Sequence, residues 1–202
     1  MNARPRILVT GFGPFPGAPE NPTEWLVGEL AGAAGSRREI ATAVLPVDYA
    51  LAGPALEVAA IAAAPDIAIH FGLAASANGF RLERVASHVQ DRSKADNSGR
   101  GAPEWLDADM PSASQLPLAS MHAALTAAGL PVEWSQDAGG YLCNHVFHLS
   151  CSGRCLPLAQ ATSGFVHIPH VGDGQRLTRE AALRGTLIIL ETCIREWCAA
   201  RP

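Results

Sequence analysis

The stretch that decides the fold runs from residue 40 to residue 72, IATAVLPVDYALAGPALEVAAIAAAPDIAIHFG. Ile40 to Val47 is a short apolar run, Tyr49 to Ala64 is longer and rich in alanine, and Ile67 to Phe71 is short and apolar again. Short β-branched runs ended by proline or glycine are typical of buried strands, whereas a long alanine-rich run is typical of a helix. The stretch therefore predicts a strand, a helix and a strand.

The residues before this stretch extend the same alternation. Arg6 to Thr10 is a β-branched run ended by glycine and predicts a strand. Pro22 to Gly32 has apolar residues at helical spacing, with Asn21 as the predicted N-cap. The order βαβαβ is typical of an α/β fold with parallel strands. We predict a three-layer α/β/α sandwich with a central, twisted, mostly parallel sheet, in one domain that spans residues 1–202.

The residues after this stretch are less regular. Leu82 to Val89 predicts a strand, and Asp91 to Pro117 is polar and predicts a long surface loop of the kind that serves as a lid or binding loop. The pattern then predicts five further elements: a helix at 118–128, a strand at 132–136, a helix at 144–151, a strand at 165–168 and a helix at 177–198.

Composition excludes several classes of protein. The 202 residues carry a formal net charge of −4 and show no basic block, so we expect no nucleic-acid partner. The most apolar stretch, residues 51–75, is interrupted by prolines and charges, and we expect no membrane span. The apolar run near the N-terminus is too short for a signal peptide, and five cysteines fit a reducing compartment. We therefore expect a cytoplasmic protein.

Cys143 is the first candidate for chemistry, because it lies between a predicted strand and a predicted helix. A thiol at a helix N-terminus is close to unpaired N–H groups, which favour the nucleophilic thiolate and can also hold an oxyanion. The alternative is that Cys143 is a small buried hydrophobic residue.

A nucleophilic cysteine needs a base, and His167 lies at the end of a short predicted strand. A histidine there would be presented at the carboxyl edge of the sheet, where α/β proteins place their sites. Glu83, or else Asp96, is the candidate carboxylate to orient the imidazole. Taken alone, Glu83 is more typical of a surface ion pair to Arg81 or Arg84.

Four segments together resemble the pyroglutamyl peptidase I family of cysteine peptidases, also called pyrrolidone-carboxylate peptidases. They are Thr10 to Phe15 with Asn21 to Thr23, Glu83 to Ala86, Ala138 to Asn144, and Gly164 to Pro169, in the order that the family has. The resemblance covers nearly the whole chain.

The resemblance implies a cofactor-free exopeptidase, without a metal, that acts on peptides with an N-terminal pyroglutamyl residue through a thioester acyl-enzyme. It implies that Cys143 is the nucleophile, His167 the general base and Glu83 the group that orients the imidazole. It further implies a lactam pocket and a possible homo-oligomer, a dimer or a tetramer. The residues implied for this pocket are Phe12, Phe15 and Tyr141, with Asn21 and the backbone near Leu73 at the ring amide.

The chain also departs from the resemblance. The family usually has asparagine where this chain has His88, and arginine where it has Ser93, so Arg92 is the residue expected to stabilise the oxyanion. These changes leave open a weakened family member that binds blocked N-termini without efficient turnover. A second alternative is a metal-binding protein, because four potential ligands cluster in the sequence: His145, His148, Cys151 and Cys155.

Overall fold

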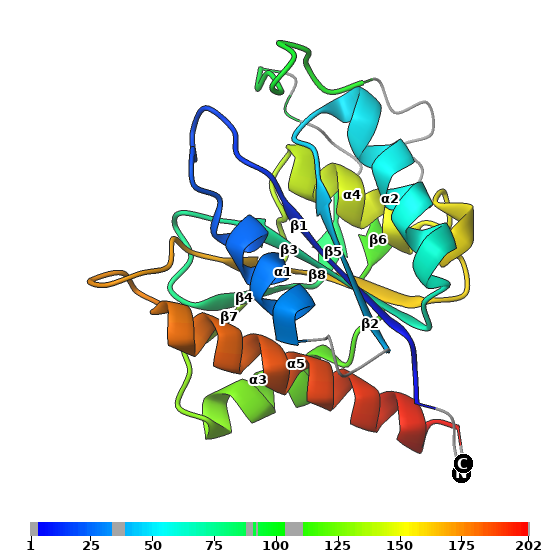
Figure 1. The fold of residues 1–202 in the computed structure, drawn as a ribbon, viewed down its shortest axis with the longest axis vertical. Helices are drawn as coiled ribbons and strands as arrows, with labels where there is room; N and C mark the ends of the chain where they lie inside the picture. The colour runs from blue at the N-terminus through cyan, green and yellow to red at the C-terminus, as the bar shows by residue number, and fades with distance from the viewer. Residues whose placement is uncertain (1–3, 34–38, 88–90, 92, 104–110, 202) are drawn as a thin grey trace.

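The computed structural model describes residues 4–33, 39–87, 91, 93–103 and 111–201. The predicted βαβαβ start is present (Figure 1). Strands β1 (Ile7–Phe12), β2 (Ile40–Leu45) and β3 (Ile67–Leu73) pair in parallel, with β1 in the middle. Helices α1 (Pro22–Ala33) and α2 (Tyr49–Ala63) connect them.

The second half of the chain completes a six-stranded sheet in the order β2-β1-β3-β8-β4-β7. Strand β8 (Thr162–Ile168) continues the parallel set beside β3. Strand β4 (Phe80–Glu83) is antiparallel to β8, and β7 (Val132–Ser135) is parallel to β4. The sheet is therefore mixed and mostly parallel, as predicted.

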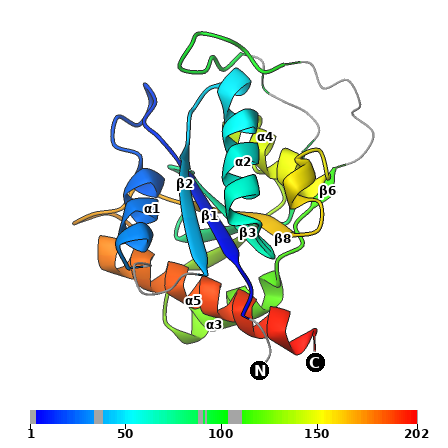
Figure 2. The same ribbon diagram turned by 45° about the vertical axis from the view of Figure 1, so that its right-hand side comes forward.

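Helices cover both faces of the sheet, as the two views in Figures 1 and 2 show. Helices α1, α3 (Leu118–Ala127) and α5 (Arg179–Ala199) pack on the three-helix face. Helices α2 and α4 (Leu142–Cys151) pack on the two-helix face. Side chains of a strand alternate between the two faces, so Ile7 and Val9 join the first core and Leu8 joins the second. The predicted α/β/α layers are thus confirmed.

The predicted strand from Leu82 to Val89 is wrong in its continuity, and its last two residues lie outside the described residues. The chain forms β4 and then a separate short strand, β5 (Val85–Ala86), because the residue between them bonds to two different neighbours. The N–H of Arg84 donates to the carbonyl of Ser135 in β7, and the Arg84 carbonyl accepts from the N–H of Ser114. The chain thereby leaves the main sheet at this residue.

The predicted loop from Asp91 to Pro117 lies partly outside the described residues, and its described part is not all loop. It contains β6 (Ser112–Ala113), which pairs with β5 in a small antiparallel sheet. A further short element, the 3-10 helix η2 (Leu156–Leu158), follows α4 and was not predicted. Such two- and three-residue elements have no sequence period of their own, so a periodicity argument does not find them.

The closing helix was predicted from residue 177 and begins at Arg179. Thr178 is its N-cap, and the Thr178 hydroxyl accepts a hydrogen bond from the N–H of Ala181 at 3.1 Å. Across the described part of the chain, every helix is too short or too polar to cross a lipid bilayer.

Candidate active site

Cys143 lies in the first turn of α4, which begins at Leu142, two residues earlier than predicted. Tyr141 is the N-cap and is extended, so the chain enters the helix just before the thiol. The first N–H groups of a helix have no partner within it. The thiol is partly exposed and lies against β3, where a Cβ added at Gly72 would come within 2.7 Å of the sulfur. The close approach of Cys143 and of the Phe165 ring, also at 2.7 Å, therefore favours glycine at position 72.

His167 and Glu83 form a buried pair on neighbouring antiparallel strands. His167 Nδ1 lies 2.7 Å from Glu83 Oε1, and the Glu83 side chain is 0% exposed. Phe80 and Leu82 of β4 pack in the core of the three-helix face. The Glu83 side chain therefore projects from the opposite face, on which α4 lies. The sheet thereby brings β4 and β8 side chains together beneath the first turn of α4.

The protonation of His167 follows from these neighbours. Burial disfavours the imidazolium, but Cys143 and Glu83 outweigh it and raise the pKa of His167 to about 9. Because a carboxylate only accepts hydrogen bonds, Nδ1 is the donor to Glu83, and Nε2 is left for the Cys143 sulfur. The arrangement can move a proton between the thiol and the imidazole.

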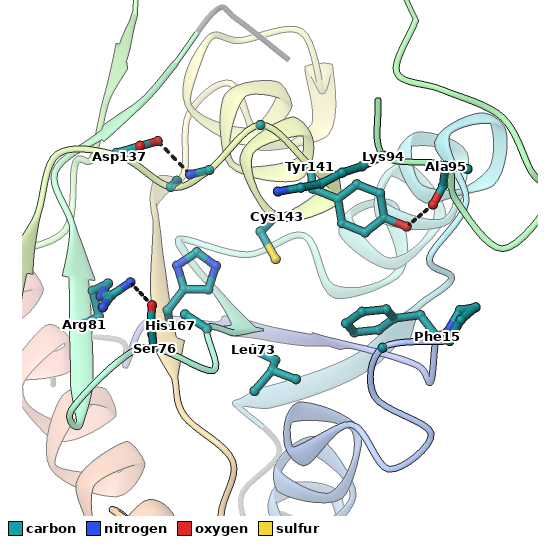
Figure 3. A pocket seen from close by; sticks show the side chains of 16 residues that line it. Phe15, Leu73, Ser76, Arg81, Lys94, Ala95, Asp137, Tyr141, Cys143 and His167 are labelled. Carbon is teal, nitrogen blue, oxygen red and sulfur yellow. Dashed lines mark hydrogen bonds between the residues drawn. The ribbon is translucent and has the colours of Figure 1, made fainter. Parts of the chain in front are cut away.

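A pocket of about 620 Å³ opens above these side chains (Figure 3). Cys143 and His167 lie in its wall. Phe15 and Tyr141 line one end, with their ring centroids 6.3 Å apart, and Ser76 and Arg81 line the other. We call these the aromatic end and the polar end.

A small recess of about 40 Å³ adjoins the aromatic end, and Phe15, Leu73 and Tyr141 line both cavities. Phe12 and Asn21 line the recess only. The structure thus brings all five residues predicted for the lactam pocket to one place beside Cys143.

Both ends of the Asn21 amide, predicted to contact the ring amide, hydrogen-bond within the protein. Its Oδ1 accepts from the N–H of Thr23 at 3.0 Å, as predicted for an N-cap, and its Nδ2 donates to the carbonyl of Gly13 at 3.0 Å. Asn21 therefore fixes the loop that follows β1 and carries Phe15.

Two alternatives for the carboxylates are wrong. Asp96 does not orient His167, because its oxygens accept from the N–H groups of Tyr49, Ser98 and Arg100. Glu83 does not form a surface ion pair, because it is buried against the imidazole.

The expected oxyanion residue, Arg92, lies outside the described residues, as does His88. Ser93 is described and is exposed; its hydroxyl donates to Asp91 Oδ1 at 2.5 Å. Its side chain is therefore held by the loop.

The residues of the metal-binding alternative have other partners. His145 is edge-on to Tyr49 at 5.4 Å, and burial, with the nearby His148, lowers its pKa to about 4. Cys151 donates to the carbonyl of Ser163, and burial raises the pKa of its thiol to about 12. Within the described ranges, no three histidine, cysteine or acidic side chains are grouped to hold a metal ion.

Several residues of the site were not predicted from the sequence. Gly72 stands at the close approach to the thiol, and Lys94 and Arg81 line the pocket. Asn144, the residue after the thiol, accepts from the N–H of Ser87 and donates to its carbonyl, both at 2.8 Å. A signal was present for Arg81, because residues two apart on a strand share a face and Glu83 was already a candidate.

A partly exposed thiol at a helix start, with an imidazole beside it and a buried carboxylate behind the imidazole, is the geometry of nucleophilic hydrolysis. The α/β layers and this site define the class as a cysteine hydrolase. Comparison with known proteins refines the class. The chain belongs to the pyroglutamyl peptidase family, whose model matches residues 5–194.

Relatives and solved structures agree with this assignment. The chain is 33% identical to the pyrrolidone-carboxylate peptidase of Pyrococcus furiosus over 95% of this chain and 99% of that protein. It is 38% identical to the enzyme of that name from Clavibacter michiganensis, over 82% and 79% of the two chains. Pyroglutamyl peptidase I of Bacillus amyloliquefaciens superposes with a TM-score of 0.84 at 26% identity, over 95% and 97% of the two chains.

Proposed function

We propose that this chain is a cysteine exopeptidase that hydrolyses the amide bond after an N-terminal pyroglutamyl residue. The observation that carries the proposal is the position of the aromatic end and its recess, directly beside the Cys143 thiol. A pyroglutamyl residue has no free α-amino group, so its flat lactam needs aromatic walls and a few hydrogen bonds rather than a carboxylate. Family membership supports the same reaction.

Cys143, His167 and Glu83 have separate roles in this proposal. The Cys143 thiolate attacks the scissile carbonyl carbon, and its electron pair forms the carbon–sulfur bond while the carbonyl π electrons move to the oxygen. The N–H groups at the start of α4 are placed to stabilise that oxyanion. As the intermediate collapses, the carbon–nitrogen bond breaks and the amine takes the proton from His167 Nε2.

A water molecule completes the turnover. His167 Nε2 removes a proton from the water, whose oxygen attacks the thioester carbon, and the carbon–sulfur bond breaks to release pyroglutamate. Glu83 holds the imidazole through Nδ1 in both steps and so acts as a positioning residue. Leu73 and Asn21 are assigned to the lactam pocket with Phe12, Phe15 and Tyr141.

The proposal is tested by release of a chromophore from a pyroglutamyl amide, with the matching prolyl amide as control. Proline has the same ring size but lacks the ring carbonyl and carries a charged amine. We expect hydrolysis of the first substrate and little of the second. A chain that binds the pyroglutamyl amide without releasing the chromophore would instead support the weakened family member.

The surroundings of the enzyme follow from its thiol. All five cysteines are free thiols, and free thiols are typical of proteins in a reducing compartment, so we place the enzyme in the cytoplasm. We expect peptides with an N-terminal pyroglutamate as its partners, and a dimer or a tetramer, which sedimentation of the purified protein would test.

A further inference from the structure

The pocket extends beyond the lactam site at its polar end. If the aromatic end holds the pyroglutamyl ring, the opposite side of Cys143 and His167 holds the leaving part of the peptide (Figure 3). Ser76 and Arg81 line this side, and Asp137 lies in the same wall. This inference rests on the function proposed above.

The position of Arg81 follows from strand pairing. Arg81 stands directly opposite His167 in the antiparallel register of β4 and β8. Directly opposed residues project from the same face of the sheet with their Cβ atoms about 5 Å apart. Arg81 is therefore a lateral neighbour of the imidazole, on the side away from Phe15 and Tyr141.

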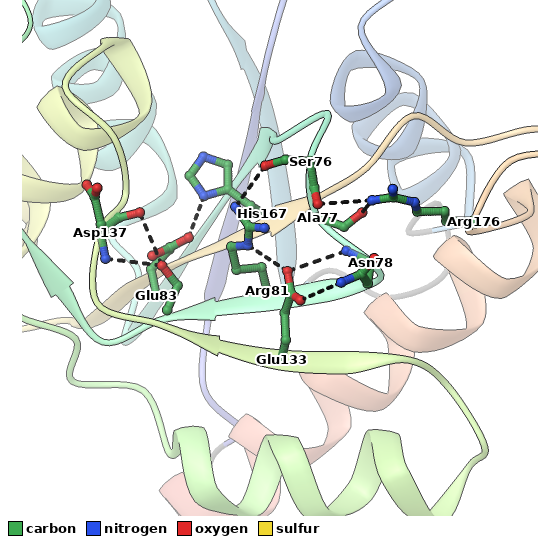
Figure 4. A network of polar contacts seen from close by, with 10 residues as sticks. Ser76, Ala77, Asn78, Arg81, Glu83, Glu133, Asp137, His167 and Arg176 are labelled. Atoms are coloured by element: carbon green, nitrogen blue, oxygen red, sulfur yellow. Dashed lines mark hydrogen bonds and ion pairs between the residues drawn. The ribbon is translucent and has the colours of Figure 1, made fainter.

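The guanidinium is held in place with its end toward the pocket. Arg81 Nε donates to Glu133 Oε1 at 2.7 Å, and its terminal Nη1 donates to Ser76 Oγ at 3.4 Å (Figure 4). Glu133 also accepts from the N–H and the amide of Asn78, so this carboxylate is shared between two partners. The Arg81 side chain is 22% exposed, which leaves its terminal nitrogens within reach of a ligand.

The carboxylate of Asp137, which lies in this wall, accepts a hydrogen bond from its own loop. Asp137 Oδ1 accepts from the N–H of Gly139 at 2.9 Å, and the Asp137 backbone bonds to the hydroxyl of Ser135. The Glu133 carboxylate does not line the pocket, whereas the Arg81 side chain does. A carboxylate of the leaving group would therefore meet the guanidinium end first.

We propose that Arg81, with Ser76, is a specificity-determining subsite that favours leaving groups with a carboxylate next to the scissile bond. A planar guanidinium forms its strongest hydrogen bonds with carboxylates. Two sources share this chemistry: the C-terminal carboxylate of a pyroglutamyl dipeptide, and an acidic side chain on the residue after the pyroglutamyl group.

The test is a ratio of kcat/KM values, which does not depend on the amount of active enzyme. Pyroglutamyl-alanine is compared with pyroglutamyl-alaninamide, and pyroglutamyl-aspartyl amide with pyroglutamyl-asparaginyl amide. We expect the carboxylate to be preferred by roughly fivefold in at least one pair, as for a partly exposed ion pair. The pair that shows the preference identifies the source of the carboxylate.

Variants at position 81 test whether Arg81 causes the preference for a carboxylate. Arg81→Gln should reduce the ratio to about one, and Arg81→Lys should restore part of it. Arg84→Gln is the matched control, because Arg84 is exposed over the Trp134 ring and outside the pocket, and it should keep the wild-type ratio.

Three outcomes would overturn the proposal. They are a wild-type ratio near one in both pairs, a preference that survives in Arg81→Gln, and an equal loss on all substrates in that variant, which would make Arg81 merely structural. Failure to cleave any pyroglutamyl substrate would instead overturn the proposed function.

Discussion

The two faces of the sheet differ in chemistry although both are covered by helices. On the three-helix face the buried polar side chains of the helices are threonines, such as Thr186, which donates to the carbonyl of Ala182 within α5. On the two-helix face the core contains buried histidines, a buried glutamate and the Cys143 thiol. One face therefore stabilises the fold, and the other also carries the reactive groups.

The reason for this division lies in the strands. Each strand sends alternate residues to opposite faces, so a single strand can supply core on one side and chemistry on the other. In β4, Leu82 packs beneath α3 and α5, while Glu83 meets His167. In β8, Val166 joins the first core, and His167 joins the site. A one-residue shift of either strand would bury the site residues in the wrong core.

The largest expected effect is a loss of turnover at Cys143, and it distinguishes this cysteine from one on the three-helix face. Cys143→Ala should lower kcat by at least roughly 10³-fold, because the nucleophile is lost. Cys193, which is buried on the three-helix face, should be replaceable by alanine with normal kcat and a lower Tm. Turnover and thermal unfolding of both variants check this. Inactivation by a thiol alkylator that maps to another cysteine, with Cys143→Ala active, would contradict the mechanism.

Glu83 gives the next largest effect. Glu83→Gln should reduce kcat by roughly 10²-fold or more, since the amide no longer favours the charged imidazole. Activity of the wild type should fall as the pH rises through about 9, where His167 loses the proton it gives to the leaving amine. In the variant this limb should move to lower pH. Glu57→Gln, at an exposed position of α2, is the control and should leave the pH profile of kcat unchanged.

The aromatic walls should have a smaller effect. Phe15→Ala should cost about 1–3 kcal/mol of transition-state binding, because the lactam loses one face of its site. Phe12→Leu tests the deeper residue with less damage to the core, in which Phe12 is 2% exposed. Phe80→Leu, on the opposite face, should lower Tm with kcat/KM unchanged. Unchanged kcat/KM in folded Phe15→Ala would make the pocket assignment wrong.

The last expected effect is on the pH dependence of stability and not on turnover. His70 is buried between the Thr10 and Ser150 hydroxyls, and burial lowers its pKa to about 3. The unfolded chain binds a proton at about pH 6.5, so stability should decrease as the pH falls from there toward 3. In His70→Asn this slope should be smaller by about 1 kcal/mol per pH unit. Urea unfolding between pH 4 and pH 7 measures the slope.

His167 affects the pH dependence of stability with the opposite sign. Its folded pKa is raised to about 9, so its stabilising contribution is complete below pH 6.5 and is lost as the pH rises through 9. The acid slope in His70→Asn should therefore change without any change of the alkaline slope. An acid slope equal to that of the wild type would show that His70 is not the group that titrates.

The sequence was sufficient for the first five elements, because their signals are local. The apolar run that predicts each element, and the proline or glycine that ends it, lie in the same short stretch of sequence. The structure confirms these elements to within a few residues. The direction of β4 was not predictable in this way, because its antiparallel pairing with β8 joins residues more than 80 positions apart, such as Leu82 and Val166. The break at Arg84 likewise depends on Ser114 and Ser135, which lie far along the chain.

The site likewise contains residues that could be predicted from the sequence and residues that could not. Cys143, His167 and Glu83 were identified from their residue types and order, and the structure places them together; their catalytic roles stay predictions. Arg81 was weighed only as a surface partner of Glu83, whereas it binds Glu133 and faces the pocket. Only the pairing register places it beside His167, and one sequence carries no signal for register across separate segments.

The pairing of β4 with β8 also determines when a refolding chain regains activity. Glu83, Cys143 and His167 come from three segments that are made one after another, and long-range contacts of this kind form slowly. A refolding chain that has formed its helices and the β1–β2–β3 half holds no oriented imidazole until β4 reaches β8. Recovery of turnover therefore reports when β4 has paired with β8.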